Sequence, residues 1–175
     1  MGIFKEGFLV RFFLIAFLGF TVAVVASAKA AEGVDQLGKC SYADKVVSPS
    51  DGSSVILGKT GNCNSDRYLL FKLKPSGDLD TAFGNGGVAI LPDGLGPYVV
   101  QLLLQSDGKL VLVTGTKISR FEAHGSLDMS YGEAGIVASL GFDATAASLD
   151  GQGRVLVAGS AVEDQMDQPV IRRFL

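Results

Sequence analysis

The chain has 175 residues, of which 47% are hydrophobic and 19% charged, and its net charge is −3. This length fits one domain, and the composition supplies enough apolar side chains for a packed core. Lys and Arg are not clustered, so the chain lacks the concentrated positive charge of a nucleic-acid-binding surface, and we predict no nucleic-acid partner. The 23 glycines are spread singly or in pairs, which predicts many tight turns.

Residues 1–30 have the layout of a secretory signal peptide. Two basic residues precede an apolar stretch at residues 12–25, and the small residues Ala26-Ser27-Ala28 follow it. This stretch is short for a membrane-spanning helix, which needs about twenty residues. We therefore expect export to the periplasm or the cell exterior, with residues 31–175 as the folded domain. The alternative is an uncleaved N-terminal anchor, which would place the protein at a membrane.

Cys40 and Cys63 are the two cysteines of the chain. In an exported protein, an even number of cysteines usually forms disulfides. The two residues form no CxxC motif, and their spacing matches no common zinc site. We predict a Cys40–Cys63 disulfide, with two free buried thiols as the alternative.

An internal repeat dominates the rest of the sequence. Residues 72–88 recur 48 positions later as residues 120–136. The copies share a basic and an apolar residue, a Gly, a Leu-Asp pair, an aromatic-Gly pair, a further Gly and a β-branched residue. The residues expected to hold the repeat together are Gly77, Leu79, Asp80, Phe83, Gly84 and Gly87 in the first copy, and Gly125, Leu127, Asp128, Tyr131, Gly132 and Gly135 in the second.

A second module lies between these copies. Residues 106–115 resemble residues 151–159 and, more faintly, residues 50–58. Each places a glycine-containing turn before an apolar run, which is typical of a β-hairpin. We divide the domain into three units of three or four short strands, at about residues 34–87, 88–135 and 136–175. In the second unit the strands are expected at about residues 88–91, 99–104, 110–114 and 117–122.

Four-stranded units of this length are typical of a β-propeller. Continuous apolar runs such as residues 111–113 favour strands that are buried on both faces. The pattern Asp-Gly-Lys-Leu-Val-Leu-Val, at residues 107–113, followed by Gly-x-Leu-Asp-x-x-aromatic-Gly, resembles the delta-60 repeat, a bacterial β-propeller repeat of uncharacterised function. The resemblance covers about residues 50–175. It implies a propeller-like fold in a secreted or surface protein and implies no reaction.

We therefore predict an all-β, propeller-like array of about three blades. Closed propellers generally have four to eight blades, and an open array leaves a bare edge strand at each end. Three arrangements satisfy this constraint. The chain pairs with a second copy into a six-bladed ring, it folds as an open array, or it is a fragment of a longer propeller.

The chemistry-bearing residues favour structural roles. Asp78 and Asp80 have a spacing that can supply oxygen ligands to calcium. However, Asp80 recurs as Asp128 whereas Asp78 is replaced by Ser126, so we predict that the repeated acids fix turns. The one histidine, His124, is expected at a solvated turn. We predict no catalytic residue, no metal ligand and no cofactor.

Glu163, Asp164 and Asp167 form an acidic, unrepeated segment between two expected strands. We expect a solvated loop there and treat these residues as weak candidates for a cation or partner site. The sequence as a whole favours a non-enzymatic binding or scaffold module with a protein or glycan partner. The alternatives are a carboxylate- or calcium-dependent hydrolase or lyase, with its site on an assembled propeller, and a truncated fragment without function.

Overall fold

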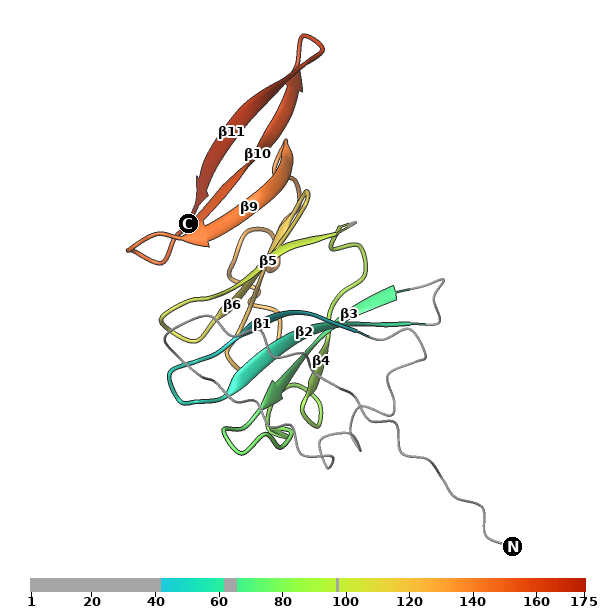
Figure 1. Ribbon diagram of the computed structural model, residues 1–175, viewed down its shortest axis with the longest axis vertical. Coiled ribbons are helices and arrows are strands. Elements are labelled where there is room, and N and C mark those ends of the chain that lie inside the picture. Colours follow the sequence, from blue (N-terminus) through green and yellow to red (C-terminus); the bar gives the residue numbers. More distant parts are fainter. Residues whose placement is uncertain (1–41, 62–65, 97) are drawn as a thin grey trace, which may run out of the picture.

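The computed structural model describes residues 42–61, 66–96 and 98–175 (Figure 1). The expected signal peptide, Cys40 and Cys63 lie outside the described residues. All regular secondary structure in the described residues is β-strand, so the predicted all-β class is confirmed. No described segment forms a helix with the length and apolar character that a membrane crossing requires.

The strands form three antiparallel sheets, and within each sheet neighbouring strands follow one another along the chain. Sheet A contains β1 (Tyr42–Val47), β2 (Ser54–Gly61), β3 (Asp66–Leu73) and β4 (Val88–Ile90). Sheet B contains β5 (Val99–Leu104), β6 (Leu110–Thr114), β7 (Ile118–Phe121) and β8 (Ile136–Val137). Sheet C contains β9 (Asp143–Leu149), β10 (Val155–Glu163) and β11 (Met166–Phe174).

The sheets are offset by one strand from the units read from the sequence. Residues 88–90, expected to open the second unit, form β4 and pair with β3 of sheet A. Residues 136–137 likewise form β8 and pair with β7 of sheet B. The reason is the repeated loop after the third strand, because it reverses the chain and returns the next strand antiparallel to the third.

This loop has the same backbone hydrogen bonds in both copies. The N–H groups of Lys74, Asp80 and Gly87 donate to carbonyl oxygens at 2.8, 2.8 and 2.7 Å. The N–H groups 48 residues later, of Glu122, Asp128 and Gly135, donate to the equivalent carbonyl oxygens at the same three distances. The sequence repeat is therefore a structural repeat.

The hairpin turns of the three sheets also repeat. Gly52, Gly108 and Gly153 follow the first strand of each sheet and have φ angles of 80°, 86° and 77°. The N–H of each glycine donates to the carbonyl oxygen three residues earlier, at 3.2, 3.0 and 2.9 Å. Glycine accepts this left-handed conformation without the steric cost that a Cβ atom brings.

Sheet B lies between sheets A and C, and each interface has its own core. The core between sheets A and B includes Val55, Leu57, Leu70, Phe83, Leu110, Leu112 and Phe121. The core between sheets B and C includes Val111, Val113, Ile118, Tyr131, Phe142, Val155 and Val157. Because successive side chains on a strand point to opposite faces, β6 contributes to both cores. This double burial accounts for its continuous apolar sequence.

The first strands of successive sheets are in contact, β1 with β5 and β5 with β9. The described residues form an open stack with no closed ring or barrel, and the β10–β11 hairpin projects from one end (Figure 1). The propeller-like arrangement predicted from the sequence thus stays a prediction.

Candidate functional site

Asp128 is the most buried carboxylate among the described residues, with a relative exposure of 3%. Its Oδ2 accepts hydrogen bonds from Lys109 Nζ and Arg120 Nε, both at 2.7 Å. Its Oδ1 accepts from the Ser130 N–H at 3.0 Å and from the Ser130 hydroxyl at 2.6 Å. The hydrogen bonds from Lys109 and Ser130 hold the pKa of Asp128 well below its usual range, although burial opposes the shift.

This carboxylate therefore joins three segments: the turn before β6, strand β7 and the repeated loop. It stays charged at neutral pH, and its two oxygens are occupied by donors. A carboxylate in this state stabilises structure and is unsuited to accept or deliver a proton in a reaction.

Asp80 is the equivalent residue of sheet A, and its carboxylate makes fewer and longer polar contacts than that of Asp128. Its side chain is 23% exposed, and Lys72 Nζ lies 4.0 Å from Oδ2. Its Oδ1 accepts from the Ala82 N–H at 3.3 Å. Ser53 stands where sheet B has Lys109, so the second cation is missing. Asp78 accepts from the Ser76 hydroxyl at 2.9 Å on the exposed surface.

Sheet C has an ion-pair centre that the sequence analysis missed. Asp150 Oδ2 accepts from Arg154 Nε at 2.7 Å and lies 3.5 Å from Arg173 Nε. Burial acts to raise the pKa of Asp150, but the bonds from Arg154 and from the N–H of Gln152 outweigh it and lower the value. The available signal was the hairpin alignment, which places Arg154 where sheet B has Lys109.

Phe83 and Tyr131 pack as equivalent aromatic residues, Phe83 between sheets A and B and Tyr131 between sheets B and C. The Arg120 guanidinium lies 4.4 Å from the centre of the Tyr131 ring. Burial raises the pKa of the Tyr131 hydroxyl, and the positive charge of Arg120 partly offsets this. Both rings are buried, so they offer no exposed face for stacking on a sugar.

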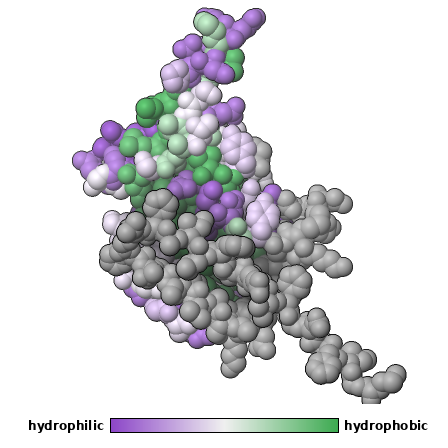
Figure 2. All heavy atoms as spheres, in the orientation of Figure 1, coloured by the Kyte–Doolittle hydropathy of each residue, from purple (hydrophilic) through white to green (hydrophobic). Residues whose placement is uncertain are grey.

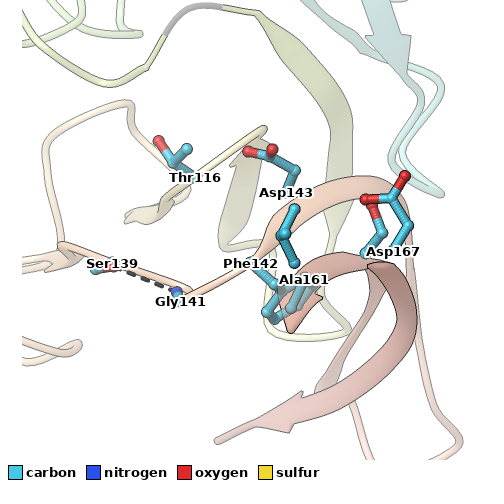
Figure 3. A pocket seen from close by; sticks show the side chains of 9 residues that line it. Thr116, Ser139, Gly141, Phe142, Asp143, Ala161 and Asp167 are labelled. Atoms are coloured by element: carbon cyan, nitrogen blue, oxygen red, sulfur yellow. Dashed lines mark hydrogen bonds between the residues drawn. The ribbon is translucent and has the colours of Figure 1, made fainter. Parts of the chain in front are cut away.

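An open groove of about 290 Å³ lies beside β9, β10 and the turn between β6 and β7 (Figure 3). Asp143 of β9 and Asp167 of β11 line it from strands on either side of β10. Its other polar side chains belong to Thr116, Ser139 and Ser160, and no basic side chain lines it. The groove can offer carboxylate and hydroxyl oxygens but no paired acid and base. No part of the chain that the structure describes brings together three or more metal-ligating side chains.

The acidic segment near residue 165 differs from its expected form. The sequence predicts a solvated loop there, but β10 continues to Glu163 and β11 begins at Met166. Asp164 and Gln165 form a two-residue turn with φ angles of 51° and 63°. Two central residues with positive φ match the twist of a hairpin, which lets both strands run to the turn. Asp167 therefore reaches the groove, whereas Glu163 and Asp164 stay at the hairpin tip.

His124 accepts from or donates to the Ser126 hydroxyl at 2.8 Å in an exposed turn.

The fold and its polar groups define an all-β protein of three stacked antiparallel sheets with internally paired acids. No family model matches the chain, and no curated protein matches it. It is similar to the crystal structure of a protein of unknown function from Bacteroides caccae, with 11% identity and a TM-score of 0.47. The alignment covers 74% of this chain and 46% of that chain, so this chain spans less than half of the neighbour's length.

Proposed function

We propose that the protein is an exported, non-enzymatic module that binds another protein, with propeller-type sheets as its framework. The observation that carries this proposal is the exposure of large apolar side chains on sheet C. Val162, Met166 and Ile171 of the β10–β11 hairpin are all exposed, as is Leu175 beyond it. Figure 2 shows hydrophobic side chains exposed on the upper part of the molecule, where sheet C lies. Val162 and Ile171 lie on the face of the hairpin that points away from sheet B, and Met166 lies on the opposite face. Exposed large apolar side chains gathered on one hairpin support a protein-binding role.

The paired acids support a framework role over catalysis. Asp128 and Asp150 are held by two cations each, and Asp80 lies near one. Charged groups that are paired in this way fix turns and strands in place. The four-stranded sheets A and B, with their first strands side by side, support the propeller-type framework.

The second candidate function is a calcium-dependent hydrolase or lyase, and the groove of Asp143 and Asp167 favours it. These acids are not part of the repeat, yet they line one groove. Titration of the protein with calcium in a calorimeter tests this candidate. Heat that is lost in Asp143→Asn would support it, and the absence of heat in the wild type would rule out a calcium site there.

The binding role is tested by immobilising the chain and quantifying by mass spectrometry what it captures from the exported proteins of its source organism. The wild type is compared with Ile171→Asp in β11 and with Ile90→Asp in β4, because both side chains are exposed isoleucines on strands. We expect a captured protein that Ile171→Asp loses and Ile90→Asp retains. Equal capture by the wild type and both variants would contradict a binding site on sheet C.

A further inference from the structure

The β10–β11 pairing defines two faces of sheet C. Val155 and Val157 of β10, together with Val170 and Phe174 of β11, pack in the core shared with sheet B. The alternate side chains lie on the opposite face of sheet C, and three of them, those of Ser160, Val162 and Asp167, also line the groove described above. We call this set the outer face of sheet C; its residues are Leu156, Ala158, Ser160 and Val162 of β10 and their partners Arg173, Ile171, Pro169 and Asp167 of β11.

The outer face of sheet C is equivalent to faces that are buried in sheets A and B. In each sheet, the residue five positions after the turn glycine pairs with an apolar residue of the next strand. The apolar partners are Leu70 in sheet A, Ile118 in sheet B and Ile171 in sheet C. Leu70 and Ile118 are each 0% exposed, because the following sheet covers them. Ile171 is 76% exposed. Sheet C thus keeps an apolar side chain at a position that is a core position in the other two sheets.

The charges on β11 indicate what covers this face. From one end to the other, its outward residues are Asp167, Pro169, Ile171 and Arg173. At the Arg173 end, Asp150 is shared by Arg154 and Arg173, so this end keeps one net positive charge, whereas the Asp167 end is acidic. Asp143 of β9 pairs with Ser160 and adds to the acidic end. A face with this polarity is complementary to itself when it is turned end to end.

We propose that a second copy of this chain covers the outer face of sheet C, with the two sheets packed face to face and their β11 strands antiparallel. This inference rests on the proposed binding role and names its partner. A two-fold axis then places Arg173 of each copy opposite Asp167 of the other, and brings the two Ile171 side chains into the centre of the contact. A parallel arrangement would place like charges together, which is unfavourable. Two-fold dimers are also the commonest closed oligomers.

A head-to-tail assembly is disfavoured by the other end of the stack. There the second copy would have to contact the face of sheet A that points away from sheet B, which carries Ile56 and Leu69. These side chains are only 9% and 2% exposed, so little of their apolar surface is free for another chain. The outer face of sheet C therefore pairs with its own equivalent.

The size of the face predicts a weak dimer. A nine-residue strand is roughly 30 Å long and three strands span roughly 14 Å, which gives about 400 Å² per copy. The total of about 800 Å² is below the range of about 1,200–2,000 Å² for stable specific complexes. Association should therefore depend on concentration, with a dissociation constant on the order of tens of micromolar.

The test is the solution mass of the full chain, purified as the cell exports it, by sedimentation equilibrium from roughly 1 to 300 µM, a range that brackets this affinity. We expect the mean mass to rise from one chain toward two. Ile171→Asp should stay at one chain, and the control Ile90→Asp should behave as the wild type. Circular dichroism reports whether each variant is folded.

Charge reversal tests the antiparallel geometry without removing apolar surface. Asp167→Arg alone and Arg173→Asp alone should each stay at the mass of one chain, because like charges then face one another. An equimolar mixture of the two variants should form a dimer, since every contact again joins opposite charges. This rescue also guards against a variant that merely fails to fold.

The inference is overturned if the wild type keeps the mass of one chain throughout, if Ile171→Asp dimerises as well as the wild type, or if the mixture of charge variants does not associate. Masses that grow beyond two chains would also overturn it, because they indicate head-to-tail contact. If the capture experiment succeeds while the mass stays at one chain, the binding role stands with a different partner.

Discussion

Asp128 and Asp80 occupy equivalent positions in the repeat but differ in what surrounds them. Asp128 is buried with two cations at 2.7 Å, whereas Asp80 is partly exposed with one cation at 4.0 Å. Removing one partner from a buried ion pair leaves uncompensated charge and is costly, whereas exposed pairs contribute little. The two residues therefore provide a matched comparison within one chain.

Asp128→Asn should lower the free energy of unfolding by about 3 kcal/mol, because Lys109 and Arg120 lose their shared carboxylate. Asp80→Asn should lower it by less than about 1 kcal/mol. Urea denaturation followed by circular dichroism measures both values. If the two substitutions lower the free energy of unfolding equally, the burial of Asp128 does not strengthen its contribution to stability.

The lowered pKa of Asp128 also predicts a pH dependence. Its folded value lies below its unfolded value of about 3.9, so its contribution is complete above about pH 5 and is lost as the pH falls toward the folded value. The stability difference between the wild type and Asp128→Asn should be about 1 kcal/mol smaller at pH 3 than at pH 7. Urea midpoints at both pH values test this, and an unchanged difference would contradict it.

At this scale the sequence predicted only part of the arrangement. The recurrence of Leu-Asp indicated that Asp80 and Asp128 are turn residues, and their side chains do accept from backbone N–H groups two residues later. The cations bound to Asp128 were not foreseen, because Lys109 and Arg120 become neighbours only through the β6–β7 pairing. Strand register, which the sequence does not specify directly, decides such contacts.

At the scale of single elements, the repeated loop depends on the backbone at Gly135. Its φ angle is 92°, and a Cβ atom there would lie 2.5 Å from Leu127 Cγ. Gly153 also has a positive φ angle, 77°, but no atom lies within 4 Å of the Cβ position. Comparison of the two glycines separates the cost of backbone conformation from the cost of a steric clash.

Gly135→Ala should lower the free energy of unfolding by about 2 kcal/mol or more, and Gly153→Ala by about 1 kcal/mol, because only the first adds a clash to the strained φ. Gly151→Ala is the control, since Gly151 has neither a positive φ nor a close neighbour. Guanidinium denaturation gives all three values. If Gly153→Ala lowers the free energy of unfolding as much as Gly135→Ala does, the clash with Leu127 adds nothing to the cost of the backbone conformation.

The positions of the strands were more predictable than their partners. In sheet B, the expected strands at residues 99–104 and 110–114 match β5 and β6, because turn glycines and apolar runs mark both ends. The strand at residues 88–90 was also expected, yet it belongs to sheet A. The acidic residues near 165 indicated a loop, whereas the hairpin needs only Asp164 and Gln165 for its turn.

For the whole molecule, the two separate cores make the stack resemble a linear repeat protein. Leu57 belongs to the core between sheets A and B, and Val157 belongs to the core between sheets B and C. In such proteins each layer is stabilised mainly by its neighbours, so an end layer can open alone. The apolar runs predicted sheets that are buried on both faces. In the structure β6 of sheet B is buried along its whole length, whereas β10 of sheet C is buried only at Val155 and Val157.

Hydrogen exchange should therefore be slowest in β6, whose five residues are all buried, and fastest in β11, where most residues are exposed. Val157→Ala should speed exchange throughout β9–β11, because it weakens the core that holds sheet C against sheet B. Exchange in β2 and β3 should change little, and the control Leu57→Ala should accelerate exchange mainly there. Mass spectrometry of peptides from labelled protein resolves the three sheets. A uniform acceleration in all sheets by either substitution would instead mean that the stack unfolds as one unit, because local opening of sheet C would then be rarer than global unfolding.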